Sequence, residues 1–346
     1  MALAKTISKL PPRSVNVLLG CALALGLLAS LMVGAADISP AQLAATLREL
    51  VISPVHEWSV ESVIIWRLRL PRALLAAAVG AALATAGAMM QGLLQNSLAD
   101  SFVLGVSSGA SLGAALAMFL GLRFTVLGLG AVTPMAFGGA VLSMLAVVSI
   151  ARQAAGKSTL GLLLAGIAMS SILSAAVSFL VLMSRERINP LVFWLMGGLA
   201  NRGWNHFLMM LPYLVVGVSI ALVYHRYLTA ISVGDATAHH LGVDVDRVRL
   251  LLLAVAALLT AAAVAVSGVI GFVGLMTPHF ARMLVGHHFR RLIPTAALCG
   301  AVFLTFADLL ARFAMRPQEL PVGIITALCG GPFFLWLMSR KRQEVS

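Results

Sequence analysis

Residues 156–159 read Gly-Lys-Ser-Thr, which is how the phosphate-binding loop of many ATPases ends. Such a loop has the form Gly-x-x-x-x-Gly-Lys-Ser/Thr between a strand and a helix, and its backbone amides cradle phosphate. Here Ala151 replaces the leading glycine, and an apolar helical run, not a strand, comes before it. A turn capped by Ser158 or Thr159 explains the residues equally well. We therefore expect no ATP hydrolysis at this position.

Asp308 is the acid that could lie at mid-membrane depth, where proton- and sodium-coupled carriers place ionisable groups. Arg312 follows four residues later on the same helical face, so the two side chains can pair. One paired acid near a helix end is a poor proton relay. A driving force from elsewhere is more economical, and an ion-coupled secondary transporter stays as the alternative.

Histidines and cysteines lack the spacing of a metal or nucleophilic site. The histidine pairs at 239–240 and 287–288 consist of neighbours that point to different helix faces, whereas metal sites favour i, i+4 spacing or converging segments. The three cysteines stand singly in apolar runs, as buried packing thiols do: Cys21, Cys299 and Cys329. We expect no metal site, no catalytic residue and no directly bound cofactor.

The composition shows what kind of protein positions these residues. Of 346 residues, 60% are hydrophobic and 10% charged, and the mean hydropathy is +1.00. Soluble domains carry about a quarter charged residues. This chain cannot cover a water-facing surface, so it is a polytopic membrane protein in contact with lipid. The net charge of +12 fits Lys and Arg kept on cytoplasmic loops and does not indicate nucleic acid.

Ten apolar runs approach the roughly 20 residues that a bilayer-spanning helix needs. They lie near 15–36, 72–95, 103–121, 126–151, 158–183, 204–228, 248–267, 274–286, 292–313 and 320–339. The run at 274–286 is short, so we expect it to be tilted or to follow a broken segment at 267–274. Glycines 105, 109 and 113 mark a smooth helix face that a neighbouring backbone can approach. The chain, 1–346, is expected to be one all-α transmembrane domain of about ten helices.

Loop charges predict the orientation. With the basic N-terminus in the cytoplasm, ten spans return the C-terminus to the same side. A set of arginines then falls outside, where arginine's rigid fork suits pairing with a carboxylate. They indicate an acidic partner, although anchoring in lipid headgroups explains any single one as well. These are Arg48, Arg67, Arg69, Arg72, Arg123, Arg185, Arg187, Arg202, Arg312 and Arg316.

The longest inside loop, about residues 229–247, contains a short polar helical stretch around Gly234–Leu241. Gly242 closes this stretch and suits a helix C-cap. Asp235 stands where an acid is favoured by the helix dipole. Such a compact element between two spans is typical of a docking element for a soluble partner, and an ordinary connector is the alternative.

Several blocks, in order, resemble one family: the FecCD-like permease subunits of ATP-driven importers for iron–siderophore complexes, haem and vitamin B12. Residues 67–114 are similar to its Arg-Leu-Pro-Arg, Asn-Pro-Leu-Ala and Leu-Gly-Val segments. Residues 271–294 are similar to its Gly-Leu-x-x-Pro-His-x-x-Arg segment, and ADLLAR…ELPVGIITALCGGPFFLWLM resembles its end. Ser97 stands where the family usually has proline, a departure expected to loosen that turn.

The resemblance implies a type II ABC importer permease fold and the partners of such an importer. These are a second permease subunit (an identical copy or a paralogue), two cytoplasmic ATPases that bind ATP and magnesium, and a periplasmic or lipid-anchored substrate-binding protein. The permease itself would be no enzyme. It would carry an iron chelate (siderophore or haem) or cobalamin across the bacterial inner membrane by alternating access, with both termini cytoplasmic.

The resemblance also implies site residues. The ATPase-coupling residues are Gly234, Asp235, Ala238, Leu241 and Gly242. The arginines that would meet glutamates on the binding protein are Arg69, Arg72 and Arg312, and Asp308 would orient Arg312. The pathway would follow the dimer axis past the fifth and tenth spans and a short helix around Asn189–Leu199. Its expected lining, for which helix packing is the rival explanation, is Ser170, Ser171, Ser174, Ser178 and Met183.

Overall fold

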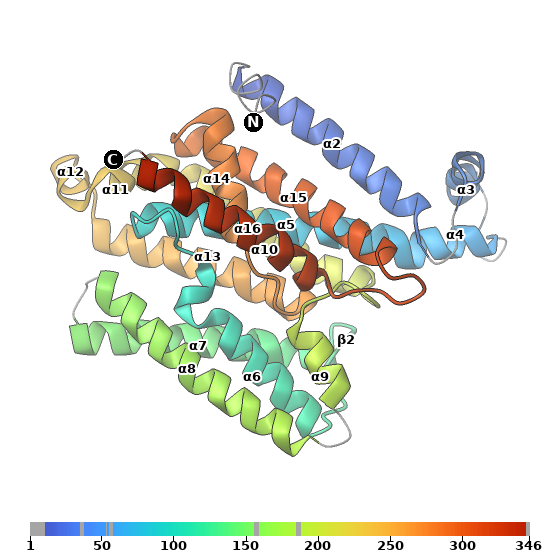
Figure 1. Ribbon diagram of the computed structural model, residues 1–346, viewed down its shortest axis with the longest axis horizontal. Coiled ribbons are helices and arrows are strands. Elements are labelled where there is room, and N and C mark those ends of the chain that lie inside the picture. Colours follow the sequence, from blue (N-terminus) through green and yellow to red (C-terminus); the bar gives the residue numbers. More distant parts are fainter. Residues whose placement is uncertain are drawn as a thin grey trace.

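The computed structural model describes residues 11–34, 38–52, 54, 58–155, 159–184 and 188–343. Its long helices lie roughly along one direction, so the molecule has two ends (Figure 1). In the described part of the chain, seven helical stretches are long and apolar enough to cross a membrane. They are α2 (Pro12–Met32), Val60–Leu93, α7 (Val132–Ala155), α8 (Thr159–Met183), α10 (Trp204–Val223), α13 (Val245–Ser267) and α15 (Phe289–Phe313).

Two shorter apolar helices and one further short helix bring the described bundle to the expected ten. The apolar ones are α6 (Val106–Phe119) and Val322–Leu337 of α16 (Val322–Gln343), and the third is the 13-residue α14 (Val273–Val285). The short eighth span, α14, follows a broken segment, which was one of the two expectations for so short a run. Between α13 and α14 the backbone leaves the helix, with positive φ at Gly268 and Phe272.

Helix α5 (Leu70–Leu93) is the centre of the bundle and is buried along almost its whole length. Two of its glycines explain how the neighbours come so close. A Cβ atom at Gly80 would overlap the carbonyl oxygen of Gly300 on α15, and one at Gly87 would overlap that of Gly274 on α14. Small residues therefore let the helix backbones touch, which is the main source of packing attraction in a membrane.

The expected smooth face on α6 is confirmed at two of its three glycines. A Cβ atom at Gly109 would overlap the carbonyl oxygen of Gly139 on α7, and one at Gly113 would overlap that of Met135. Gly105 has another role, because it lies before α6 with φ +73°, a left-handed conformation that glycine adopts without strain.

The span expected at 126–151 begins later, because its first residues form a hairpin. Strand β1 (Thr125–Val126) pairs antiparallel with β2 (Leu129–Gly130), with Thr125 opposite Gly130. The turn residues Leu127 and Gly128 have φ of +52° and +75°. Positive φ at both positions matches the twist of a two-residue hairpin, so this short segment departs from the all-α expectation.

The second span begins earlier than expected. Helix α4 (Val60–Ile64) continues through a π-helical turn, η2 (Ile65–Arg69), into α5. In this turn the Leu70 N–H donates to the Ile65 carbonyl, which is the wider π spacing. The turn leaves Arg67 exposed and Arg69 buried. It therefore decides which arginine faces the interior.

The remaining elements mark the two ends. Helices α11 (His225–Val233) and α12 (Asp235–His240) lie at the left of Figure 1, where α16 also ends; we call this the α12 end. Helix α3 (Pro40–Ile52), the hairpin and α9 (Ile188–Leu195) lie toward the right, which we call the α3 end. The 3₁₀ turn η3 (Ser101–Leu104) leads into α6.

Candidate functional site

The three expected docking arginines come together at the α3 end, where they line a cavity of about 290 Å³. A fourth, Arg202, joins them from the loop before α10. We call this the arginine cavity; its charged lining is Arg69, Arg72, Arg202, Arg312 and Glu319. Four guanidinium groups thus face one cavity at one end of the bundle.

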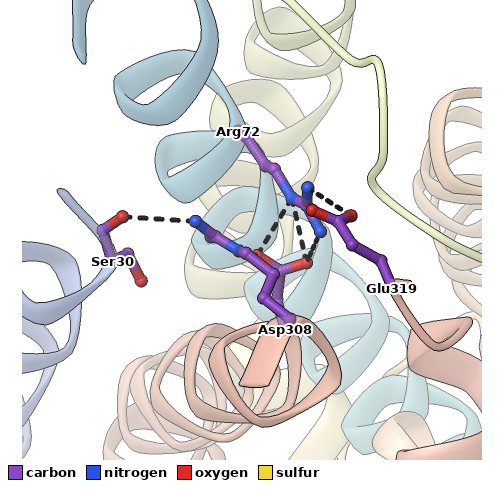
Figure 2. Close-up of polar contacts among 5 residues, drawn as sticks. Ser30, Arg72, Asp308 and Glu319 are labelled. Atoms are coloured by element: carbon purple, nitrogen blue, oxygen red, sulfur yellow. Dashed lines mark hydrogen bonds and ion pairs between the residues drawn. The ribbon is translucent and has the colours of Figure 1, made fainter. Parts of the chain in front are cut away.

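Asp308 of α15 lies beneath the cavity and binds two of the arginines (Figure 2). Its Oδ1 accepts from Nη2 of Arg72 at 2.9 Å, and its Oδ2 accepts from Nε of Arg312 at 2.8 Å. The carboxylate has no solvent exposure. The expected pairing of Asp308 with Arg312 is confirmed, and the bond to Arg72, 236 residues away along the chain, is new.

Glu319 and Ser30 complete this cluster, and neither was among the expected site residues. Arg72 Nη1 donates to Glu319 Oε2 at 2.8 Å, and Arg312 Nη1 donates to the Ser30 carbonyl at 3.2 Å. Glu319 begins the ELPVG block that resembles the family's end, which is the signal that could have singled it out. The cluster ties α2, α5 and α15 to the loop before α16.

Arg69 binds the end of helix α2. Its Nη1 donates to the carbonyls of Leu31 (2.7 Å) and Met32 (2.9 Å), which have no partner inside the helix. Gly34 makes space for this side chain, because a Cβ atom at that position would overlap the Arg69 guanidinium. Like Arg72 and Arg312, Arg69 is thus held by internal partners, and the docking role of the three stays a prediction.

Arg202 differs from the other three arginines. Its Nη1 lies 3.1 Å from Nε2 of His206, and its buried Nε has no hydrogen-bond partner in the described part of the chain. Burial lowers the pKa of Arg202, and no carboxylate is paired with it in that part. It also lines a neighbouring cavity of about 360 Å³. A partly buried cation without a carboxylate partner is the group here that an external carboxylate would satisfy.

At the α12 end, the expected short helix is confirmed. Helix α12 runs from Asp235 to His240, and Gly242 follows with φ +79°, as a closing glycine should. Ala238 is fully buried, whereas Leu241 is 70% exposed. An exposed leucine on a short surface helix is available to a partner, so α12 has both an anchored and an open side.

Asp235 does more than start this helix. Its Oδ1 accepts from Nη2 of Arg249 on α13 at 2.6 Å and from Nε2 of Gln95 at 3.0 Å. Gln95 also donates to the Ile231 carbonyl. Helix α12 is thereby tied to α13 and to the turn after α5. The expectations missed Gln95 and Arg249, because their meeting depends on how three helices pack.

The turn with the departure at Ser97 is closed by hydrogen bonds. The Asn96 side chain accepts from the Leu98 N–H at 2.9 Å, and the Ala99 N–H donates to the Asn96 carbonyl. A hydrogen bond from the backbone N–H to an asparagine side chain two residues earlier commonly stabilises such a turn.

The expected pathway serines lie on α8, at the lower edge of Figure 1. Ser171, Ser174, Ser178 and Met183 are exposed, and Ser170 is partly exposed. Three of the serines line a hollow of about 370 Å³ with Ile167. This face is uncharged, with its serines set among exposed apolar side chains such as Ile167 and Ile172, and one copy of the chain leaves it open. The geometry fits a pathway or a subunit contact, and neither role is tested by it.

Two sequence features could do chemistry of their own, the Gly-Lys-Ser-Thr stretch and a metal-binding cluster. Residues 156–158 lie outside the described residues, while α7 ends at Ala155 and α8 begins at Thr159, so helices flank the Gly-Lys-Ser-Thr stretch. Arg185 and Arg187 also lie outside. Wherever the chain is described, no group of three His, Cys, Asp or Glu side chains is placed to hold a metal ion. The described charged sites can pair charges, and the pathway role of the serines stays a prediction.

The chain matches the FecCD transport family over residues 22–340. It is 47% identical to the cobalamin import system permease protein BtuC of Halobacterium salinarum, over 81% of this chain and 74% of that protein. It is 37% identical to the Fe(3+)-citrate import system permease protein YfmD of Bacillus subtilis, over 92% of each. The matched residues include the arginine cavity, α8 and α12.

A solved structure described as an inward-facing conformation of a metal-chelate type ABC transporter has a similar fold. It has 32% sequence identity and a TM-score of 0.81, covering 95% of this chain and 99% of that one. The relatives are permease subunits, and ATP hydrolysis is the task of a separate subunit. The chain therefore belongs to the FecCD transport family and has the fold of a type II ABC importer permease.

Proposed function

We propose that this chain is the permease of an importer for a metal chelate or a corrinoid, and that cobalamin is its cargo. The observation that carries the proposal is the position of three sites on one chain. The arginine cavity lies at one end, α12 lies at the other, and the uncharged serine face of α8 lies between them. An importer needs a contact for its binding protein, a contact for its ATPase and a route between them.

The choice of cargo is supported by the relatives and by the serine face. Two relatives named for cobalamin or vitamin B12 import are 47% and 40% identical over 81% and 86% of this chain. The hemin permease HmuU of Yersinia pestis is 45% identical over 54%. Hydroxyl groups without charge suit a large cargo that is held loosely, and they offer nothing that would retain a citrate-type anion.

The α12 end is proposed to face the cytoplasm, with both termini on that side of a bacterial inner membrane. Arg13, Arg226, Arg290 and Arg291 all lie at this end, in agreement with the positive-inside tendency. Two ATPase subunits would bind there through α12. A second permease, identical or paralogous, would face α8, and a substrate-binding protein would dock at the α3 end.

Coupling between the two ends is proposed to run through α5. Arg72 stands in its first turn, and Gln95, which holds Asp235 of α12, stands two residues beyond its last. A 24-residue helix is about 36 Å long. Movement of α12 on ATP binding would thus be passed by Asp235 to α5 and α13, and along them to the arginine cavity.

Docking is proposed to bring acidic groups of the binding protein to the arginine cavity. Arg202 is the natural first contact, since in the described part of the chain it has no carboxylate of its own. Arg69, Arg72 and Arg312 would take part by exchanging or sharing their internal partners. Such an exchange would weaken the hydrogen bonds that hold α2, α5 and α15 together when the loaded binding protein docks.

The test is uptake into proteoliposomes that hold this chain with its ATPase and binding protein. Cobalamin, haem and a ferric siderophore would be compared with and without ATP. We expect ATP-dependent accumulation of cobalamin that stops when the binding protein is omitted. Accumulation of another cargo would reject the choice of cobalamin, whereas uptake driven by an ion gradient without any ATPase would reject the importer itself.

A further inference from the structure

A cavity of about 910 Å³ lies at the α12 end and belongs to none of the sites above. It lies between the start of α2, the first turn of α11 and the start of α15. Among the described residues, its lining includes no acidic one. The basic and polar members are Arg13, Asn16, His225, Arg226, Thr229, His288, Arg290 and Arg291. We call it the basic cavity.

Its arginines lack the internal partners that the arginine cavity provides. Arg13, Arg226, Arg290 and Arg291 are exposed, and none makes an ion pair or side-chain hydrogen bond with a residue that the structure describes. Like charges gathered around one concave space raise the local positive potential and attract counter-ions. The cavity is thus arranged for an anion.

Two helix starts add to the same field. Helix α2 begins at Pro12 and α15 at Phe289, and both lack an acid in the first turn and a side-chain cap. The positive end of a helix dipole favours a negative group such as phosphate. In α2 this contribution comes from the dipole more than from free N–H groups, because Pro12 has none. Pro12 and His288 both line the basic cavity, so these two starts border the same space.

The surroundings indicate a lipid rather than a soluble anion. One turn beyond Arg13 on α2, Val17 and Leu18 are exposed and continue as an apolar face. At the start of α11, the rings of Tyr224 and Tyr227 lie 5.4 Å apart, and tyrosine is enriched at the depth of lipid headgroups. A ligand with a charged head and an apolar tail fits both features.

We propose that the basic cavity binds the headgroup of an anionic phospholipid, its phosphate held by the arginines and its acyl chains along the apolar face of α2. Basic pockets between transmembrane helices are suited to such headgroups. The lipid would tie α2 and α15 to α11, which leads directly into α12. The site does not depend on which cargo the protein carries.

The experiment uses native mass spectrometry of the purified permease. It compares how much phosphatidylglycerol and how much phosphatidylcholine stay bound. The variant R226Q/R290Q/R291Q removes three arginines from the lining. We expect the preference for phosphatidylglycerol to fall by about fivefold for each arginine lost. The control, R152Q/R247Q, removes two exposed arginines outside the cavity and should keep the preference. The variant R226K/R290K/R291K keeps the charge and should retain most of it.

Two results would overturn the proposal. One is equal retention of phosphatidylglycerol by the wild type and the glutamine variant, provided that both have the same helix content. The other comes from inorganic phosphate alone, added to the permease in phosphatidylcholine nanodiscs. If phosphate raises the melting temperature as much as phosphatidylglycerol does, and the glutamine variant abolishes this, the ligand is a soluble phosphate.

Discussion

Asp308 is the residue on which the arginine cavity depends most. It receives hydrogen bonds from guanidinium groups of two helices while having no exposure to solvent. Without it, Arg312 would be a buried cation with no carboxylate partner in the described chain, and Arg72 would keep only Glu319. An unpaired buried cation is costly in a low-dielectric interior. A carboxylate used in this way is a structural anchor, which agrees with a transporter driven by a separate ATPase.

Replacing Asp308→Asn should therefore destabilise the protein by about 3–5 kcal/mol. Asp244→Asn is the matched control, because Asp244 also pairs with an arginine but in an exposed position. It should cost no more than about 1 kcal/mol, through its lost exposed pair alone, because asparagine caps a helix about as well as aspartate. Thermal unfolding in detergent, followed by circular dichroism, measures both. Equal melting temperatures for the two variants would contradict the anchoring role.

Replacing Arg202→Gln should weaken binding-protein docking by about tenfold or more, the value of one charge-assisted hydrogen bond. The melting temperature should hardly change, since in the described chain no internal carboxylate loses its partner. Arg48→Gln, on exposed α3 and outside the cavity, is the control. Affinity is measured by surface plasmon resonance on nanodiscs; unchanged affinity in Arg202→Gln would remove that arginine from the docking surface.

Among the elements, α5 connects the sites. It is buried along most of its length, packs closely against α14 and α15, and has an arginine of the cavity at one end. The turn after its other end holds α12 through Gln95. A helix so closely packed transmits a displacement rather than absorbing it, because close-packed interiors are hard to compress.

The contact between α6 and α7 can be tested with two neighbouring glycines. A Cβ atom at Gly139 would overlap the Gly109 carbonyl, whereas one at Gly138 would meet nothing within 4 Å. Gly139→Ala should cost about 1–3 kcal/mol by overpacking. Gly138→Ala should be neutral or stabilise by up to about 1 kcal/mol, as helix propensity predicts. The melting temperatures of the two variants in detergent measure these effects. Equal melting temperatures would mean that α6 and α7 pack less closely than described.

The tie between α12 and α13 can be tested with two neighbouring arginines. Arg249 binds Asp235 and is largely buried, whereas Arg247 pairs with Asp244 in the open. Arg249→Gln should lower cargo transported per ATP by about tenfold, the equivalent of ~1.5 kcal/mol. Arg247→Gln should leave this ratio within about twofold. Uptake and phosphate release are measured on the same proteoliposomes; a normal ratio in Arg249→Gln would place the coupling elsewhere.

At the scale of the whole molecule, one copy of the chain leaves the serine face of α8 without cover. Only 22% of this apolar span is buried inside the chain, against 78% for α13. Lipid tails offer serine hydroxyl groups no hydrogen-bond partner. Water in a pathway, or polar groups of a facing subunit, would offer one. The proposed permease pair, with its pathway at the contact, would account for this open face.

Cysteine accessibility tests this arrangement. In a background without native cysteines, Ser174→Cys should react with a water-soluble maleimide in assembled transporters, because the pathway admits water. Val215→Cys, exposed on α10, should stay unreactive because it faces lipid. The fraction labelled is read by mass spectrometry. Protection of Ser174→Cys combined with disulfide formation between two copies would instead assign this face to a dry subunit contact.

Much of this protein follows from its sequence alone. Ten spans, the broken segment before α14, the short helix closed by Gly242 and the close contact at Gly109 all depend on local patterns. Length and hydropathy determine a span, and a glycine permits a close approach, whatever the rest of the chain does. Local patterns in order were also enough to identify the family.

Only the tertiary structure decided which groups meet. Arg72 and Asp308 are 236 residues apart, and Gln95 and Asp235 are 140 apart. The π turn at Ile65–Arg69 determines that Arg69 points inward and Arg67 outward, and the basic cavity exists because the starts of α2 and α15 lie beside α11. Such meetings depend on helix packing angles and on one-residue shifts of register. A pattern read along a single chain does not contain them, since many packings would bury the same apolar faces.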